Sequence, residues 1–284
     1  MVLVSATTFG TLAIFAKLGY AAGLATDQLL AYRFALAAVG MLALALAVGQ
    51  NPLRLQRSRL LVLLGMGAFI YTAQSLAYFL ALRSLPASLV VLIAYIYPSL
   101  VVVAGWLFLH RRISALHGAA LVASFAGVAM LIGGTSFEAS WALALAIASP
   151  IVYTGYILVG ERVMGSVPAV AASAVIMTGA AISFCLLAML AGQLSLPRSN
   201  AGWGVAVGIA IVPTMLAISL FLASLPRVGA ARASLLSTWE PVVTVLLAVA
   251  FLGDRLSLLQ LVGGALVLLA VVVVQASRPV EPPA

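Results

Sequence analysis

Ten apolar segments, separated by short polar breaks, dominate this chain of 284 residues. A helix that crosses a lipid bilayer needs about 20 mostly apolar residues, and short breaks are typical of neighbouring antiparallel helices. We therefore expect an all-α integral membrane protein with ten transmembrane helices. The predicted spans are residues 1–20, 27–49, 60–82, 86–109, 113–133, 141–161, 168–192, 201–224, 230–252 and 256–275.

The composition excludes a soluble protein of this size. Apolar residues make up 65% of the chain and charged residues only 7%, whereas soluble domains carry roughly 25% charged residues. The chain is apolar from Met1 onward and lacks the basic start of a cleavable signal peptide. We expect this segment to be the first span, and the lipid bilayer to be the surroundings of most of the chain.

The net charge of +8 predicts orientation and not nucleic-acid binding, because the basic residues form no patch. Cytoplasmic loops of membrane proteins are enriched in Lys and Arg. With both termini in the cytoplasm, the inner ends of the spans carry Arg54, Arg57, Arg59, Arg111, Arg112, Arg162, Arg227, Arg232 and Arg278. The outer ends then carry only Lys17, Arg83, Arg198 and Arg255. This predicts a multi-pass protein of the cell (inner) membrane with both termini cytoplasmic.

The chain resembles itself at a spacing of about 143 residues. The matching pairs are Pro98 with Pro241, Phe108 with Phe251, Leu109 with Leu252, Arg112 with Arg255, and Ser114 with Ser257. Five spans are an odd number, so two such units must cross the membrane in opposite senses, as in many secondary transporters. We expect one repeat at 1–134, an inverted one at 135–276, and a disordered cytoplasmic tail at 277–284. The alternative is a chance likeness between apolar helices.

Polar side chains form stripes on several predicted helices, and in a bilayer such stripes face protein or trapped water. Tyr71, Gln74, Ser75 and Tyr78 share one face of the third span. Similar stripes lie on the sixth span (Ser149, Tyr153, Tyr156), the fourth (Ser88, Tyr95, Ser99) and the ninth (Ser234, Ser237, Glu240 or Pro241, Thr244). The alternative is that these groups join helices or bond to their own backbone. The predicted substrate-binding residues are Tyr71, Gln74, Tyr78, Tyr95, Tyr153, Tyr156 and Trp239.

Glu240, Arg33 and Lys17 form the predicted coupling or charge site. Glu240 lies about ten residues into its span, so about 15 Å deep, where a charge costs on the order of 3 kcal/mol. It is either a proton carrier, an acceptor for a substrate amine, or a structural group that is paired with Lys17 or Arg33 or is permanently protonated. Arg33 either receives a carboxylate or pairs with Asp27 near the outer surface.

Prolines in the middle of spans remove a helix hydrogen bond and allow a kink. They act either as hinges that open one side of the protein or as fixed bends. The four predicted hinge residues are Pro98, Pro150, Pro213 and Pro241.

These features favour a secondary transporter that exports or exchanges small metabolites by alternating access. The tyrosines suit amino acids, including aromatic ones, and protons are a candidate coupling ion. The sequence has no nucleotide-binding motif, and its two histidines and single cysteine predict no metal site. We therefore expect no cofactor and no enzyme. The alternatives are an ion or solute channel and, with His110 and His117 as its only histidines, an intramembrane enzyme.

Several motifs resemble the EamA-type members of the drug/metabolite transporter superfamily. They are Phe9-Gly10-Thr11 followed by Lys17, Arg33-Phe34, Glu240-Pro241-Val242, Leu252-Gly253-Asp254-Arg255-Leu256, and Gln260 with Gly263. The resemblance implies ten helices in two inverted halves, cytoplasmic termini, and export or exchange of small metabolites. The many tyrosines are most similar to YddG-type exporters of aromatic and other amino acids. Asp254 replaces the signature glutamate of the family, and His110-Arg111 takes the corresponding place in the first half.

Overall fold

The computed structural model describes residues 1–110, 113–133, 141–164 and 167–276. All regular secondary structure in these ranges is helical, and ten of the helical spans are long and apolar enough to cross a membrane. Each span begins and ends within a few residues of a predicted segment. The prediction of an all-helical protein with ten membrane spans is therefore confirmed.

We number the spans 1 to 10 along the chain. Spans 1 to 5 consist of α1 (Val2–Gly10) with α2 (Leu12–Ala21), α3 (Thr26–Ala47), α4 (Arg57–Gly65) with η2 (Met66–Tyr71) and α5 (Thr72–Ser84), α6 (Ala87–Ala94) with α7 (Tyr97–Leu109), and α8 (Ala115–Gly133). Spans 6 to 10 consist of α9 (Trp141–Met164), α10 (Ala169–Leu190), α11 (Asn200–Ala210) with η3 (Ile211–Leu216) and α12 (Ala217–Val228), α13 (Ala230–Ser237) with α14 (Trp239–Leu247) and η4 (Ala248–Leu252), and α15 (Leu258–Ala276). A short 3-10 turn, η1 (Pro52–Arg54), precedes span 3.

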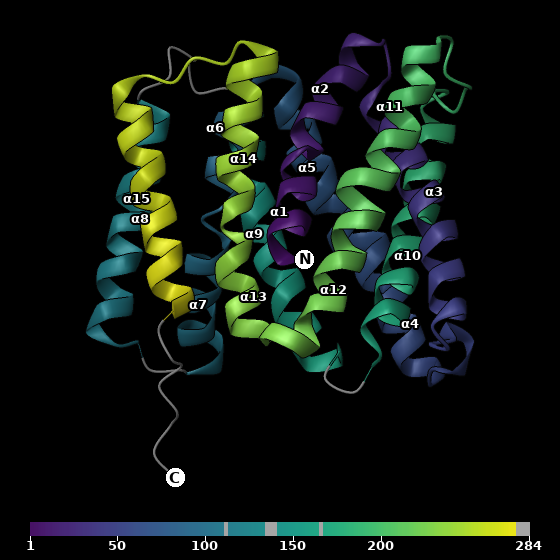
Figure 1. Cartoon of the computed structure of the whole chain (residues 1–284), viewed down its shortest axis with the longest axis horizontal. Coiled ribbons are helices and arrows are strands. Elements are labelled where there is room, and N and C mark those ends of the chain that lie inside the picture. Colours follow the sequence, from purple (N-terminus) through teal and green to yellow (C-terminus); the bar gives the residue numbers. More distant parts are fainter. Residues whose placement is uncertain (111–112, 134–140, 165–166, 277–284) are drawn as a thin grey trace.

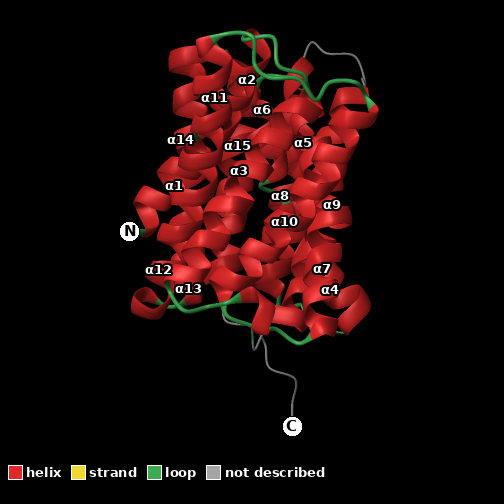
Figure 2. Ribbon diagram, turned by 90° about the vertical axis from the view of Figure 1, so that its right-hand side faces the viewer, coloured by secondary structure: helices red, strands yellow, loops and turns green. Residues whose placement is uncertain are grey.

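The helices stand side by side, with their connections gathered at two opposite ends of the bundle (Figure 2). We name these ends the Asp254 face and the Arg57 face, after a residue at each. Large apolar side chains point outward along the helices, among them Val39, Phe69, Val122, Ile182, Phe251 and Leu269. Such a surface would be costly in water, and it matches the hydrocarbon of a bilayer.

Helices of the two halves pack against each other in pairs. Helix α3 runs along α10 at one lateral edge of the molecule, and α8 runs along α15 at the opposite lateral edge (Figure 1). Between them, α1 packs on α12, α5 packs on α9, and α6 packs on α14. In span numbers, the pairs are 2 with 7, 4 with 9, 5 with 10, 1 with 8, and 3 with 6. Spans 2, 4 and 5 thus pack on the spans five places further along the chain, and the pair 1 with 8 has its counterpart in the pair 6 with 3.

Helices α8 and α15 meet backbone to backbone at two glycines. A Cβ atom placed on Gly127 would lie 2.6 Å from the carbonyl oxygen of Gly263, and one on Gly263 would lie 2.6 Å from the carbonyl oxygen of Gly127. No side chain fits between the two helices at this point. Small residues at a helix crossing allow such a close approach and are typical of membrane interfaces.

Spans 3 and 8 each contain one π-helical segment, η2 and η3, at nearly equivalent positions. In each, a threonine hydroxyl donates to a carbonyl oxygen five residues earlier: Thr72 to Gly67 at 2.9 Å, and Thr214 to Ile209 at 2.8 Å. In span 8 the cause is visible in the sequence. Pro213 has no amide hydrogen for the carbonyl of Ile209, and the Thr214 hydroxyl takes its place.

Asp254 caps the start of span 4 from across the molecule. Its Oδ2 atom accepts hydrogen bonds from the backbone nitrogen of Ser88 at 2.9 Å and from the Ser88 hydroxyl at 2.7 Å. The first amides of a helix have no partner within that helix, and a carboxylate at this end also interacts favourably with the helix dipole. Lys17 of span 1 interacts electrostatically with Asp254. Asp254 therefore connects spans 4 and 9 at one face of the bundle.

The glycine crossing yields a stability prediction. We expect Gly263→Ala to lower the thermal stability of the purified protein in detergent, because the new methyl group meets a backbone oxygen that cannot move aside. Overpacking of this kind costs about 1–3 kcal/mol. Gly155→Ala is the matched control, because a Cβ there meets nothing within 4 Å. Equal stability of the two variants would contradict the described crossing.

The cap on span 4 yields a second prediction. Asp254→Ala should lower the thermal stability of the purified protein, because the loss of a helix cap costs about 0.5–2 kcal/mol. Arg255→Ala, at the exposed neighbouring position, should leave the unfolding temperature nearly unchanged. A smaller loss for Asp254→Ala than for this control would show that the cap does not stabilise the protein.

Candidate functional site

Spans 4 and 9 are both interrupted close to the middle of the membrane. Helix α6 ends at Ala94 and α7 begins at Tyr97, while α13 ends at Ser237 and α14 begins at Trp239. An interrupted helix leaves backbone carbonyls without an amide partner. The hydroxyl of Tyr95, from the first interruption, donates to the carbonyl oxygen of Ser237, in the second, at 3.1 Å. The two interruptions therefore face each other.

Glu240 lies in the first turn of α14, directly beside this contact. The Tyr95 hydroxyl also lies 2.9 Å from Oε2 of Glu240 and can donate to it. A tyrosine hydroxyl has one hydrogen, so it serves either the carboxylate or the Ser237 carbonyl at any moment. The start of a helix favours negative charge, which partly offsets the cost of a carboxylate at this depth.

Span 1 closes the site on one side through Gly10. A Cβ atom at Gly10 would lie 2.9 Å from the carbonyl oxygen of Glu240 and from the side chain of Val243. The Thr244 hydroxyl hydrogen-bonds to the carbonyl oxygen of Gly10 at 2.9 Å. The glycine of the Phe9-Gly10-Thr11 motif is therefore explained by the close approach of span 9.

A row of six aromatic rings leads away from Glu240. Successive ring centroids are 6.0 Å apart for Tyr95 and Tyr97, 4.9 Å for Tyr97 and Tyr153, 5.6 Å for Tyr153 and Tyr156, 5.3 Å for Tyr156 and Tyr71, and 5.6 Å for Tyr71 and Phe34. We call these six residues the aromatic row. It draws on spans 2, 3, 4 and 6, so both halves of the chain contribute to it.

Gln74 joins spans 3 and 6, which also carry Tyr71, Tyr153 and Tyr156 of the aromatic row. Its Nε2 atom donates to the hydroxyl of Ser149 at 3.1 Å, and its Oε1 atom accepts from Ser75 at 3.3 Å. Gln74 thus has partners within the protein, as expected of a polar side chain that holds two membrane helices together.

Arg33 lies at the far end of the row and is 3% exposed. Its Nε atom donates to the Thr214 hydroxyl oxygen at 3.0 Å. The central guanidinium carbon lies 4.7 Å from the ring centre of Phe34 and 5.5 Å from that of Phe79. Within the part of the chain that the structure describes, Arg33 forms no ion pair with a carboxylate.

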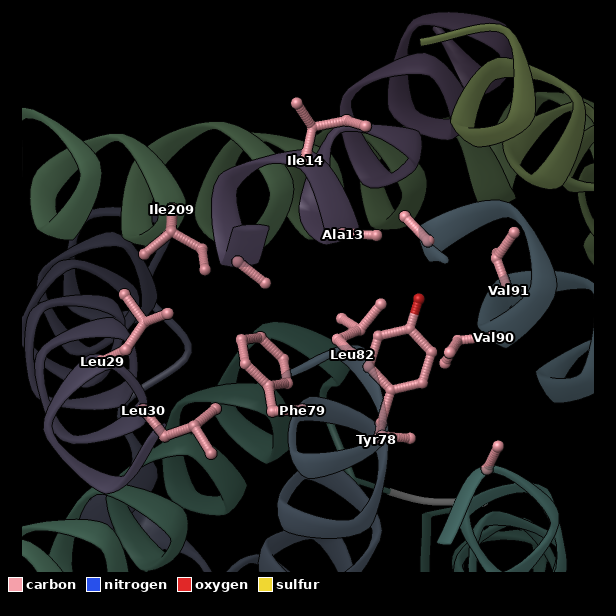
Figure 3. Packing of buried hydrophobic residues seen from close by; sticks show 14 of the residues in the cluster. Ala13, Ile14, Leu29, Leu30, Tyr78, Phe79, Leu82, Val90, Val91 and Ile209 are labelled. Carbon is pink, nitrogen blue, oxygen red and sulfur yellow. The ribbon is translucent and has the colours of Figure 1, made fainter. Parts of the chain in front are cut away.

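Tyr78 lies near both charged groups. Its side chain is 8% exposed, and it interacts electrostatically with both Glu240 and Arg33. In Figure 3 its hydroxyl oxygen points toward the space between the helices that carry Ala13 and Val91, while Phe79 lies on the side of Leu29 and Leu30. Tyr78 therefore lies near both an acidic and a basic group of the site.

The structure brings most of the predicted residues together, but it places Trp239 and Lys17 elsewhere. The Trp239 side chain is 42% exposed, and its indole nitrogen donates to the Thr7 hydroxyl at 3.2 Å. Lys17 lies toward the Asp254 face, where its acidic neighbour is Asp254 and not Glu240. Within the described residues, no hydrogen bond or ring pair joins either side chain to the aromatic row.

Three of the four predicted hinge prolines lie at irregular points of their spans. Pro98 and Pro241 lie in the first turn of α7 and of α14, just after the two interruptions, and Pro213 lies in η3. Pro150 lies inside the continuous helix α9.

Sequence reasoning missed Tyr97, Phe34 and Thr214. Tyr97 escaped because it lies only two residues from Tyr95, on another face of any regular helix; the interruption at Tyr95 turns both rings toward the same row. Thr214 follows Pro213, and this Pro-Thr pair in an apolar span was the available signal. Phe34 adjoins Arg33, and an aromatic ring beside an intramembrane arginine was the signal there.

The arrangement offers two opposite charges, several hydroxyl groups and a row of rings in the middle of a membrane bundle. Intramembrane ionisable residues of this kind mark pathways of solutes and protons. The rings provide flat apolar surfaces with polar edges, which suit small organic molecules.

Comparison with known proteins agrees with these features. The model of the EamA-like transporter family matches residues 1–133 and again residues 140–275. The chain is 26% identical over 273 residues to the uncharacterized transporter YcbK of Bacillus subtilis (strain 168), covering 92% of this chain and 87% of that protein. It is 32% identical over 180 residues to the uncharacterized transporter YwfM of the same organism, covering 61% and 58%.

The fold also has a counterpart among solved structures. One crystal structure of a protein matches with a TM-score of 0.69 at 21% identity, covering 96% of this chain and 94% of that one. At this identity the likeness shows the fold alone. The family match covers nearly the whole chain, and its relatives are named as transporters. The chain therefore belongs to the EamA-like transporter family of the drug/metabolite transporter superfamily, and it is a multi-pass membrane transporter and not an enzyme.

Proposed function

We propose that this transporter exports or exchanges small metabolites, above all amino acids, by alternating access, with its substrate site between Glu240 and the aromatic row. The observation that carries the proposal is the half-buried Glu240 side chain, whose carboxyl lies 2.9 Å from the Tyr95 hydroxyl, at the end of a row of rings. A carboxylate binds an amine, and tyrosine rings pack against apolar or aromatic side chains.

The proposed architecture is a pair of inverted repeats, residues 1–134 and 135–276, and the tail predicted at 277–284 lies outside the described residues. The division is supported by the matching pattern of helix pairs in the two halves. The interruptions of spans 4 and 9, which face each other, support it as well. We orient the Arg57 face toward the cytoplasm of the cell, because more of the basic residues belong to that face. Both termini then lie in the cytoplasm, and the protein belongs in the inner membrane.

Movement between the two open states needs helices that bend. The interruptions at Tyr95 and Thr238, followed by Pro98 and Pro241, leave spans 4 and 9 without continuous hydrogen bonding at their centres. The halves of these spans on either side of the substrate site can therefore tilt with little loss of helix structure. We propose that they act as the hinges.

A proton on Glu240 would couple the transport to a gradient. In the charged state, the carboxylate accepts the hydrogen of Tyr95. In the neutral state, the acid donates to the Tyr95 oxygen, and the Tyr95 hydrogen turns to the carbonyl of Ser237. In the neutral state all three groups are therefore hydrogen-bonded, whereas in the charged state the Ser237 carbonyl gives up the Tyr95 hydrogen. Because a proton and a substrate amine compete for one carboxylate, the transporter carries either the proton or the substrate at a time. Protons and substrate therefore cross the membrane in opposite directions.

Replacement of the carboxyl group tests this coupling. In liposomes loaded with labelled amino acids, Glu240→Gln should abolish the response of transport to a pH gradient, because the amide cannot bind a proton, while exchange of substrate for substrate continues. Asp27→Asn, which removes a carboxyl group in the first turn of span 2, is the matched control and should keep the response. An unchanged pH response in Glu240→Gln would remove Glu240 as the proton site.

The aromatic row predicts a preference that depends on the substrate side chain. Tyr153→Leu should weaken the uptake affinity for aromatic amino acids by about 2- to 10-fold, since aromatic pairs are worth about 0.5–1.5 kcal/mol beyond their buried area. Small amino acids such as alanine should lose less. Trp239→Leu, which removes an exposed ring outside the row, should change neither affinity. Equal effects of the two variants would place the substrate away from the row.

A further inference from the structure

Arg33 is a buried cation whose partners among the described residues are all neutral. These partners are the Thr214 hydroxyl, the rings of Phe34 and Phe79, and the hydroxyl groups of Tyr71 and Tyr78. Charges buried in a protein are normally paired, and in a membrane they are costly when they are not. Aromatic rings compensate only a small part of this cost, about 0.5–2 kcal/mol each.

The carboxylates of the described residues lie elsewhere. Glu240 accepts from Tyr95, and Asp254 accepts from Ser88. Glu161 lies near the C-terminal end of span 6, toward the Arg57 face, and has its own partner. Asp27 lies six residues before Arg33 on the same helix, about 9 Å along the axis. Within the described ranges, the site thus holds a positive group without its counter-ion.

The guanidinium is held in a fixed position. Because Pro213 cannot donate to the carbonyl of Ile209, the Thr214 hydroxyl donates to it at 2.8 Å. This turns the lone pairs of the Thr214 oxygen toward Nε of Arg33, 3.0 Å away. The bond uses Nε, so Thr214 does not occupy the two terminal amino groups of Arg33, which form the fork that binds carboxylates. Pro213 therefore also helps to orient Arg33.

We propose that Arg33 binds a carboxylate group of the transported solute, and that the substrates are small carboxylates, among them amino acids. The inference rests on the proposed function and extends it to substrate class. Tyr78 interacts electrostatically with both Arg33 and Glu240, so both charges lie near this one side chain. The solute carboxylate supplies the counter-ion that the described protein does not, so the charge is paired only in the loaded transporter.

The test compares carboxylates with their uncharged analogues. The purified protein is mixed with phenylalanine, phenylalanine amide and phenethylamine, and with further pairs of small carboxylic acids and their amides. Binding is measured as the rise in unfolding temperature with ligand concentration. We expect each carboxylate to bind the wild type more tightly than its amide does. Arg33→Gln should weaken carboxylate binding by roughly 10- to 100-fold, the range of charged hydrogen bonds, and leave amide and amine binding unchanged.

Arg83→Gln is the matched control, because it removes an exposed arginine at the end of span 3, and it should retain the preference for carboxylates. If Arg33→Gln does not fold, Arg33→Lys is measured; it keeps the charge but loses the fork, and should weaken carboxylates selectively. Equal affinity of acid and amide for the wild type would overturn the inference, and so would equal losses for both ligands in the variant.

The outcomes also separate this inference from the proposed function. A wild type that binds other carboxylates but neither transports nor binds amino acids contradicts the proposed substrate and leaves the role of Arg33 intact. A wild type that transports amino acids, with Arg33→Gln transporting them at unchanged affinity, contradicts only the role of Arg33.

Discussion

The structure depends on one constraint: inside a hydrocarbon layer, every polar group must find its partner within the protein. The Tyr95 hydroxyl is the partner of two such groups, the carboxyl of Glu240 and the carbonyl of Ser237, and its single hydrogen serves one of them at a time. That carbonyl belongs to the last residue of α13, where span 9 is interrupted. The same bonds that stabilise the broken helix therefore also hold the titratable group, and fold and site are not separable here.

The constraint explains what the sequence predicted well. Spans were predictable because each must be apolar over a fixed length, and the tyrosines of spans 3 and 6 were predictable because a polar stripe on a regular helix has one inward face. Tyr71, Tyr153 and Tyr156 follow this logic and meet in the aromatic row. Glu240 stood out because an acid at that depth is costly.

What the sequence could not predict lies where the helices are irregular or where partners come from distant spans. Tyr97 joins the row because span 4 is interrupted at Tyr95, and helical periodicity does not carry across an interruption. Lys17 and Trp239 are residue types that are typical of binding sites, but Lys17 lies near Asp254 and Trp239 lies beside Thr7. The link from Asp254 to Ser88 joins residues 166 positions apart, and no local pattern indicates such a pairing.

The crossing of α8 and α15 at Gly127 and Gly263 has a consequence for motion. Side chains that interlock can repack as helices slide, but two backbones in direct contact have no intermediate layer to rearrange. Sliding there would separate the helices, whereas rotation about the contact point would preserve it. In the alternating-access cycle that we propose, spans 5 and 10 are therefore expected to stay together at this edge of the molecule, and any movement of one relative to the other is expected to be a rotation about the glycine contact.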